Sequence, residues 1–232
     1  MKFNVIVADC PWSFKDSLSM SDVKRGAKAN YNTMTTEEIA AIDVKSITSP
    51  DGAILALWVP SSLLQQGLDV MKAWGFTHKQ TYVWVKIKKE PFFGFRKWIV
   101  KSILKHPQVA YDDFAYKRAI NAIIDSLKNL SLNDCRCFGM GRLFRQTHEI
   151  CLIGISNNNI YKMLNNKSQR SVRMAENLKH SAKPEDLQDS LDLMFPNATK
   201  LEMFARRIRP GWECIGNEVC NGEDINVSIS NL

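Results

Sequence analysis

The sequence contains no run of 18 apolar residues, although 45% of its 232 residues are hydrophobic. A helix that crosses a bilayer needs about 20 such residues, so we expect no membrane span and no membrane partner. The apolar run near the N-terminus is also too short for the core of a secretory signal peptide. Together with a charged fraction of 24%, these absences predict a cytoplasmic globular protein.

Several catalytic and ligand-binding signatures are missing as well. There is no Gly-x-Gly-x-x-Gly fingerprint for a dinucleotide and no Gly-x-Ser-x-Gly elbow of a serine hydrolase. The histidines at positions 78, 106, 148 and 180 lack metal-site spacing, and Cys135 and Cys137 have too few neighbouring ligands for zinc. The six cysteines are scattered, which is typical of reduced thiols and not of a disulfide framework. We therefore expect no metal.

The most informative segment that is present is Asp9-Cys10-Pro11-Trp12, at the end of the short apolar run 3–8. The run reads as a buried strand, and Pro11 stops it. A carboxylate and a main-chain carbonyl can accept both hydrogens of an exocyclic amine, while an indole offers a stacking face for a flat base. Ligands of open α/β sheets bind outside the carboxyl ends of strands, where this segment would lie. The alternative is an ordinary strand-to-loop junction with a core tryptophan.

The rest of the chain alternates predicted strands with predicted helices. The strands are expected at 53–59, 80–86, 148–155, 200–205 and 212–216. Helices are expected after a capping box formed by Thr35 and Glu38, from Ser61 or Ser62 to about 74, and from Pro184 to about 195. This alternation predicts a Rossmann-like α/β fold, with a mostly parallel sheet and helices on both faces.

Residues 87–137 interrupt this alternation and read as a basic helical insertion within a single domain of residues 1–232. Between positions 88 and 136 there are ten Lys or Arg residues and five Asp or Glu residues, so this segment holds most of the chain's formal surplus of +7. The sequence pI of about 9.1 suits a polyanionic partner. The insertion is either a nucleic-acid-recognition surface with exposed aromatic residues or a solvated structural cap.

Several motifs, in this order, resemble the MT-A-type adenine-N6 methyltransferases, a family that includes the catalytic subunit of the messenger-RNA methyltransferase and bacterial and phage DNA enzymes. Asp9-Cys10-Pro11-Trp12 is similar to the Asp-Pro-Pro-Trp of that family. The other matching segments are Tyr31-Asn32-Thr33-Met34, Leu57-Trp58-Val59, Val83-Trp84-Val85-Lys86, Gly141 to Gly154 with its His148-Glu149-Ile150-Cys151 block, Lys183-Pro184, Glu202-Met203-Phe204-Ala205-Arg206, Gly211-Trp212 and Gly216-Asn217-Glu218. The resemblance covers the chain outside residues 87–137.

This resemblance implies a class I methyltransferase fold with a permuted order, in which the catalytic motif comes first and the cofactor-ribose motif last. It implies S-adenosyl-L-methionine as the methyl donor and the N6 amine of adenine as the acceptor. DNA is the expected partner; RNA is the alternative substrate, and a catalytically inactive nucleic-acid-binding subunit is the alternative function. The protein is expected to be a monomer or a homodimer.

The resemblance also implies roles for individual residues. Asp9, Cys10, Pro11 and Trp12 are the expected catalytic residues, and Tyr31, Lys86 and Glu149 are the expected substrate-binding residues. The expected cofactor-binding residues are Asp9, Lys183, Phe204, Arg206, Asn217 and Glu218. Some of these residues also have a purely structural interpretation. Phe204 would be a core residue, Arg206 and Arg207 a solvated pair, and Asn217 and Glu218 ordinary turn residues.

One position departs from the family pattern, because Cys10 stands where proline is usual. The main-chain carbonyl is retained, so the amine-binding geometry survives with less rigidity. A cysteine nucleophile of the kind used by cytosine-C5 methyltransferases is a weaker interpretation, since those enzymes have proline before cysteine and this chain has the reverse order.

Overall fold

The computed structural model describes residues 1–14, 33–89, 113–128, 135–137, 139, 143–177, 182–219 and 222–232. The strands within these residues are β1 (Val5–Ala8), β2 (Ile54–Val59), β3 (Thr77–Ile87), β4 (His148–Ile155), β5 (Val172–Glu176), β6 (Lys200–Met203) and β7 (Glu213–Ile215). The helices are α1 (Thr36–Ala40), α2 (Val44–Ile47), α3 (Leu64–Ala73), α5 (Asp113–Lys128), α7 (Asp186–Met194) and α8 (Ile225–Ser230), with the short 3-10 helices η2 (Ser61–Leu63) and η4 (Asn158–Met163).

The seven strands form one sheet in the order β5-β3-β4-β2-β1-β6-β7. Strand β1 pairs in parallel with β2 on one side and with β6 on the other, and β6 pairs in parallel with β7. Strand β4 runs antiparallel to β2, with Ile150 opposite Val59. The sheet is therefore mostly parallel, which confirms the predicted Rossmann-like α/β fold class.

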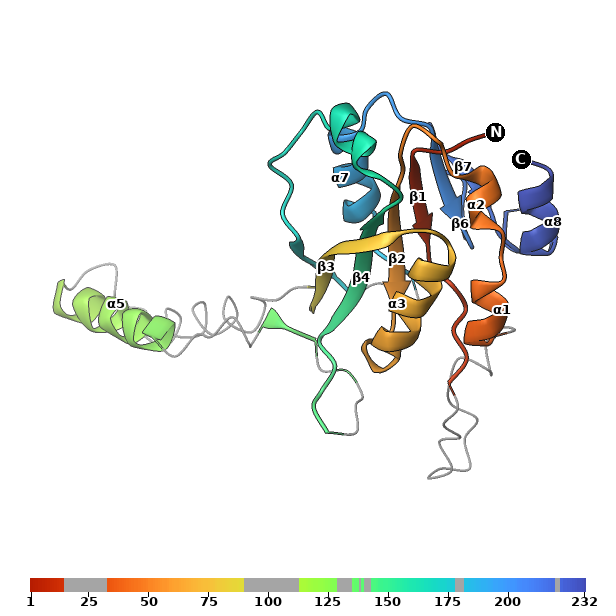
Figure 1. Ribbon diagram of the computed structural model, residues 1–232. Helices are drawn as coiled ribbons and strands as arrows, with labels where there is room; N and C mark the ends of the chain where they lie inside the picture. The colour runs from red at the N-terminus through yellow and green to blue at the C-terminus, as the bar shows by residue number, and fades with distance from the viewer. Residues whose placement is uncertain are drawn as a thin grey trace, which may run out of the picture. The chain divides into compact units, whose positions relative to one another are not determined.

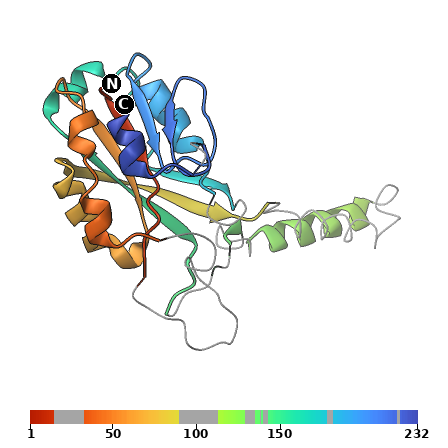
Figure 2. The same cartoon turned by 90° about the vertical axis from the view of Figure 1, so that its right-hand side faces the viewer.

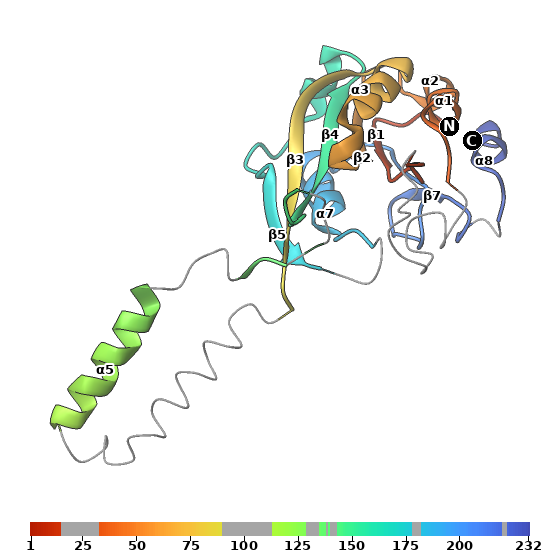
Figure 3. The same cartoon turned by 90° about the horizontal axis from the view of Figure 1, so that it is seen from below.

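Helices cover both faces of the central strands. Helices α1, α2 and α3 lie on one face and α7 lies on the other (Figures 1 and 3). Figure 2 shows α8 beside α1 and α2, and its Ile225 and Ile229 belong to the same core cluster as Ile39 of α1. Every residue of β1 and β2 is buried, as expected for parallel strands that are covered on both faces.

Local signals set the ends of two helices as the sequence predicts. At the start of α1 the Glu38 N–H donates to the Thr35 hydroxyl over 3.2 Å, and the Thr35 N–H donates to the Glu38 carboxylate over 2.7 Å. This is the predicted capping box. Helix α3 stops at Ala73, and Gly75 follows with a φ of 86°, a left-handed conformation that glycine adopts without strain.

Other boundaries differ from the prediction. Strand β3 begins at residue 77 and not at 80, and β6 ends at Met203 and not at 205. The early end of β6 has a clear cause, because Phe204 turns the chain with a φ of 59°. Two short helices, α2 and α8, and the edge strand β5 were not expected.

The described residues form two compact units. The first contains Met1–Trp84, Glu149–Arg173 and Glu185–Leu232, and the second contains Val85–His148 and Met174–Pro184. The second unit includes α5, on which Phe114, Tyr116, Lys117 and Arg118 are exposed and the Arg118 guanidinium lies 4.7 Å from the Phe114 ring centre. Much of the predicted insertion, including 90–112, lies outside the described residues, so its boundaries stay a prediction.

Candidate functional site

The turn after β1 is held by main-chain hydrogen bonds. The Trp12 N–H donates to the Cys10 carbonyl over 2.9 Å, which closes a tight turn around Pro11. The Met34 N–H donates to the Pro11 carbonyl over 2.8 Å, and the Ser13 N–H donates to the Met34 carbonyl over 2.9 Å. Because a carbonyl oxygen has two lone pairs, the Cys10 carbonyl can still accept a second hydrogen bond. The half-buried Asp9 stands directly before this turn.

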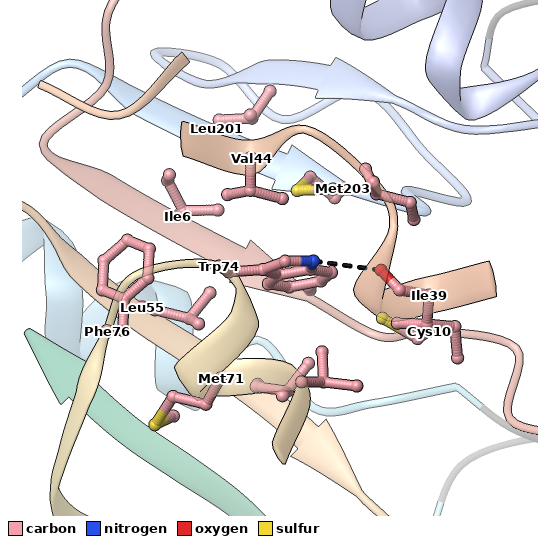
Figure 4. Close-up of a cluster of buried hydrophobic side chains, with 14 of the residues drawn as sticks. Ile6, Cys10, Ile39, Val44, Leu55, Met71, Trp74, Phe76, Leu201 and Met203 are labelled. Atoms are coloured by element: carbon pink, nitrogen blue, oxygen red, sulfur yellow. Dashed lines mark hydrogen bonds between the residues drawn. The ribbon is translucent and has the colours of Figure 1, made fainter. Parts of the chain in front are cut away.

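The Cys10 side chain belongs to the core. It is 4% exposed and lies in the cluster with Ile39 and Trp74, whose indole N–H donates to the Ile39 carbonyl over 3.0 Å (Figure 4). Burial, and then the neighbouring Asp9 charge, raise the pKa of the Cys10 thiol. A nucleophilic cysteine needs an accessible thiolate, so this environment argues against a cysteine nucleophile.

The Trp12 side chain connects the turn after β1 to β2. Its indole N–H donates to the Trp58 carbonyl of β2 over 2.9 Å, and the residue is 4% exposed. The side chain thus links the carboxyl ends of β1 and β2. This contact fixes the direction in which the chain leaves β1, while the expected stacking of Trp12 on a base stays a prediction.

The ends of β6 and β7 approach each other closely at the same edge of the sheet. Phe204 follows β6 in a left-handed conformation, and its half-buried side chain packs against the core cluster. Gly216 follows β7, and an added Cβ at Gly216 would lie 2.6 Å from the main-chain N and O of Ala205. Only glycine permits this approach. The packing of Phe204 against the core cluster supports the structural interpretation of that residue, and its expected contact with the cofactor stays a prediction.

Three of the expected cofactor residues gather beyond this contact. The Arg206 Nε lies 3.7 Å from the Glu218 Oε1, and Arg206, Asn217 and Glu218 are all exposed. A guanidinium can bind a ligand carboxylate, and a glutamate can accept from two ribose hydroxyls. The residues present therefore fit a ligand that has both a ribose and a carboxylate, as S-adenosyl-L-methionine does.

Beneath the edge lies Glu202, which belongs to one of the family motifs but has no role predicted from the sequence. Glu202 of β6 pairs in register with Val7 of β1, and the Gln188 amide N–H donates to its Oε1 over 3.2 Å. Burial raises the pKa of Glu202 and the Asp9 charge adds to the rise, while the Gln188 hydrogen bond and the charges of Arg207 and Arg209 oppose it. Because side chains alternate along a strand, the sequence predicts that Glu202 lies on the opposite face of β6 from Leu201 and Met203. No sequence signal predicts its hydrogen bond with Gln188.

The remaining predicted residues are distributed over the two units. Glu149 of β4 directly precedes Ile150, which pairs with Val59 at the end of β2. Glu149 therefore lies at the same sheet edge as Asp9. Lys86 and Lys183 are half-buried and belong to the second unit, and Tyr31 lies outside the described residues. The roles expected for these four residues stay predictions.

Among the described residues, no helix combines the length and the apolar content that a bilayer span requires. In the same residues, no three His, Cys, Asp or Glu side chains come together as a metal site would require.

Comparison with known proteins gives relatives over nearly the whole chain. The chain is 25% identical over 229 residues to an N(6)-adenosine-methyltransferase MT-A70-like protein of Arabidopsis thaliana, a match covering 98% of this chain and 25% of that protein. It is 22% identical over 220 residues to the human N(6)-adenosine-methyltransferase catalytic subunit METTL3, covering 94% of this chain and 28% of that protein. This chain therefore spans only about a quarter of the length of these two relatives.

A bacterial methyltransferase and a family model also match most of this chain. The chain is 24% identical over 236 residues to the type II methyltransferase M.MunI of a Mycoplasma species, a match covering 94% of this chain and 78% of that protein. The MT-A70 family model matches residues 3–110 and 98–218, which together span most of the sequence. On this match, and on the turn and sheet edge described above, the chain belongs to the MT-A70 family.

Proposed function

We propose that this chain transfers a methyl group from S-adenosyl-L-methionine to the N6 amine of adenine in DNA. Methyltransferases of the MT-A70 family depend on S-adenosyl-L-methionine. The observation that carries the proposal is the braced turn Asp9-Cys10-Pro11-Trp12 at the sheet edge that also holds the Phe204 and Gly216 contact. The turn offers the Asp9 carboxylate and the Cys10 carbonyl to the adenine amine. The same sheet edge holds Arg206, Asn217 and Glu218, which suit the ribose and the carboxylate of the cofactor.

The adenine amine is a poor nucleophile because its lone pair is delocalised into the ring. The Asp9 carboxylate and the Cys10 carbonyl would accept its two hydrogens, which favours a more pyramidal nitrogen and orients its lone pair. When bound, S-adenosyl-L-methionine supplies an electrophilic methyl group on a sulfonium. The chain's contribution is then positioning and electrostatic stabilisation of a direct in-line displacement, with no covalent enzyme intermediate.

The other site residues would hold the two ligands. Asn217 and Glu218 would bind the ribose hydroxyls, and Arg206 and Lys183 the carboxylate of the cofactor. Phe204 would contact its adenine or its methionine part. Trp12, Tyr31, Lys86 and Glu149 would contact the target nucleotide, which has to leave a duplex at a cost of a few kcal/mol.

The choice of DNA rests on one comparison. The match to M.MunI spans 78% of that type II methyltransferase, a class that modifies DNA, whereas the match to METTL3 spans 28%. Seven of the relatives are named N(6)-adenosine-methyltransferases, which supports RNA as the alternative substrate.

We also propose that residues 1–232 form a single methyltransferase domain in which 87–137 is a basic insertion that contacts nucleic acid. Support comes from the charge surplus of this segment and from the exposed Phe114, Tyr116, Lys117 and Arg118 of α5. Cations that neutralise phosphates and aromatic rings that stack on bases both contribute to the affinity of proteins for nucleic acid.

One experiment tests the reaction and the substrate together. The purified protein is incubated with S-adenosyl-L-methionine and, separately, with unmethylated duplex DNA, single-stranded DNA and RNA, and the digested nucleosides are identified by mass spectrometry. N6-methyldeoxyadenosine is the expected product. N6-methyladenosine from the RNA sample alone would assign RNA as the substrate. No methylated adenine in any sample, together with no cofactor binding, would favour the inactive relative.

A further inference from the structure

A single arginine in the loop between β6 and β7 contacts three carboxylates at the start and along one side of α7. The Arg209 Nη1 lies 2.6 Å from Glu185, and its Nη2 lies 2.5 Å from Asp189 and 2.9 Å from Asp192. The Arg209 side chain is only 14% exposed, although its partners Glu185 and Asp189 are 45% and 63% exposed, so the arginine end of these contacts is the end shielded from solvent. We call Arg209 and these three acids the α7 clamp.

Two more contacts extend the α7 clamp. The Trp212 indole N–H donates to Asp192 over 3.0 Å, and the Arg209 guanidinium lies 5.9 Å from the Trp212 ring centre. Arg207 contacts the second oxygen of Glu185 over 2.6 Å. The loop that leaves β6 at Phe204 and returns to β7 at Glu213 is therefore fastened to α7 at three of its residues.

The clamp holds a segment that the proposed function assigns to the cofactor. The loop begins with Phe204 and Arg206 and leads through β7 to Asn217 and Glu218. Glu185, which contacts both Arg207 and Arg209, is the residue that directly precedes α7.

The loop also contains a conformation that needs outside support. Phe204 has a φ of 59°, which is uncommon for a residue with a side chain and persists when surrounding contacts enforce it. The next residue, Ala205, lies close to Gly216 and donates its N–H to the Ile215 carbonyl over 2.9 Å, and the α7 clamp holds the same loop again at Arg209. A loop held at both of these residues limits the positions that Arg206 between them can take.

We propose that Arg209 is a positioning residue, which holds the β6–β7 loop against α7 in the conformation that binds S-adenosyl-L-methionine. The inference rests on the proposed function, because it concerns the affinity of that cofactor. Arg209 would not touch the cofactor. It would act through Arg206, three residues before it in the same loop.

The test measures cofactor affinity and stability separately. The dissociation constant for S-adenosyl-L-methionine is determined by isothermal titration calorimetry for the wild type and for Arg209→Met and Arg209→Lys, and each variant's thermal midpoint is recorded. We expect Arg209→Met to raise the dissociation constant by about 10-fold or more, since small displacements of positioning groups have effects up to 100-fold. Arg209→Lys should recover part of the loss, because an ammonium keeps the charge but cannot reach three carboxylates as a guanidinium does. With a methylatable substrate, KM for the cofactor should rise more than kcat falls.

Lys200→Met is the matched control. Lys200 is buried, and its Nζ lies 3.4 Å from Asp192, so this variant also removes a cation from the acids of α7. It lies at the opposite end of β6 from the loop. We expect a lower thermal midpoint with an unchanged dissociation constant.

The outcomes separate this inference from the proposed function. Wild-type affinity in Arg209→Met, measured at a temperature where the variant is folded, would overturn the inference and leave the proposed function intact. Equal losses of affinity in Arg209→Met and Lys200→Met would also overturn it, because stability alone would then explain both. A wild-type protein that binds no S-adenosyl-L-methionine would reject the proposed function and this inference together.

Discussion

Asp9 and Cys10 are neighbours in the chain with different surroundings. Asp9 is half-buried at the sheet edge, whereas the Cys10 thiol is packed into the core. Only the main-chain carbonyl of Cys10 remains suited to a substrate contact. The two positions therefore contribute to the proposed site in different ways, one through its side chain and one through its backbone.

Replacing Asp9 by alanine should remove methylation and leave cofactor binding measurable. The carboxylate is the proposed acceptor for the adenine amine, and loss of one such polar contact commonly lowers kcat by about 100-fold or more. The rate is measured by methyl transfer from labelled cofactor, and binding by calorimetry. Asp51→Ala, in an exposed turn, is the control. Full activity of Asp9→Ala would contradict the assigned site.

Cys10→Ala should weaken the fold without removing the activity. Deleting one buried group of about methylene size costs about 1 kcal/mol of unfolding free energy, measurable by urea denaturation. Methylation per folded molecule should stay at the wild-type level because the carbonyl is unchanged. A serine at this position would bury a hydroxyl among apolar side chains and should destabilise more. An inactive but folded Cys10→Ala would instead support a chemical role for the thiol.

At the scale of elements, the contact between β6 and α7 contains a half-buried acid. Glu202 receives one hydrogen bond from Gln188, whose own amide oxygen is buried and has no hydrogen-bond partner among the described residues. A neutral side chain with a donor would suit this place better than a carboxylate. The stability of the protein should therefore depend on the ionisation of Glu202.

Burial raises the pKa of Glu202 above its usual value of 4.5, so between that value and the raised one the native state holds more protons than the unfolded chain. The contribution of Glu202 to stability is full below pH 4.5 and is lost as the pH rises through the raised pKa. Glu202→Gln should then be more stable than the wild type at pH 8, by about 1 kcal/mol through a hydrogen bond to Gln188. This advantage should shrink toward pH 4 in thermal melts. Glu213→Gln, at an exposed position of β7, should show no such trend.

The elements predicted best are those with strong local signals. The β-branched run of β1, the capping box of Thr35 and the glycine after α3 all act through neighbouring residues, so the sequence indicates them directly. Strand β5 was missed because its five residues alternate exposed and half-buried positions and include Arg173 and Glu176. The antiparallel direction of β4 is not indicated by any periodicity in the sequence.

The candidate site likewise contains features that local sequence predicts and features that depend on tertiary packing. The turn at Asp9 and the edge at Gly216 were found from short motifs, since their chemistry is local. Glu202 with Gln188 and the three acids around Arg209 depend on where α7 packs against the sheet. Such tertiary contacts join residues 14 to 24 positions apart and leave no pattern in a single sequence.

For the whole molecule, the distribution of charge predicts how binding responds to salt. Replacing Lys88, Lys89, Arg96 and Lys97 by glutamine should weaken nucleic-acid binding and flatten its dependence on salt. Each lost phosphate contact should reduce the slope of log K against log salt by about 0.7 to 0.9. Fluorescence anisotropy at several salt concentrations measures this slope. Lys45→Gln with Lys72→Gln, both exposed on α2 and α3, is the control, and an unchanged slope in the insertion variant would make the segment a structural cap.

The reversed direction of β4 has a consequence for how substrate choice can change in evolution. Parallel strands bring only their carboxyl ends to the sheet edge that holds Asp9, whereas β4 brings its amino end, at Glu149, to that edge beside the end of β2. The chain that leads into β4 can therefore vary in length and composition without disturbing the buried strands β1 and β2. Relatives with the same methyl-transfer chemistry could diverge in the nucleic acid that they recognise by altering this one entry segment.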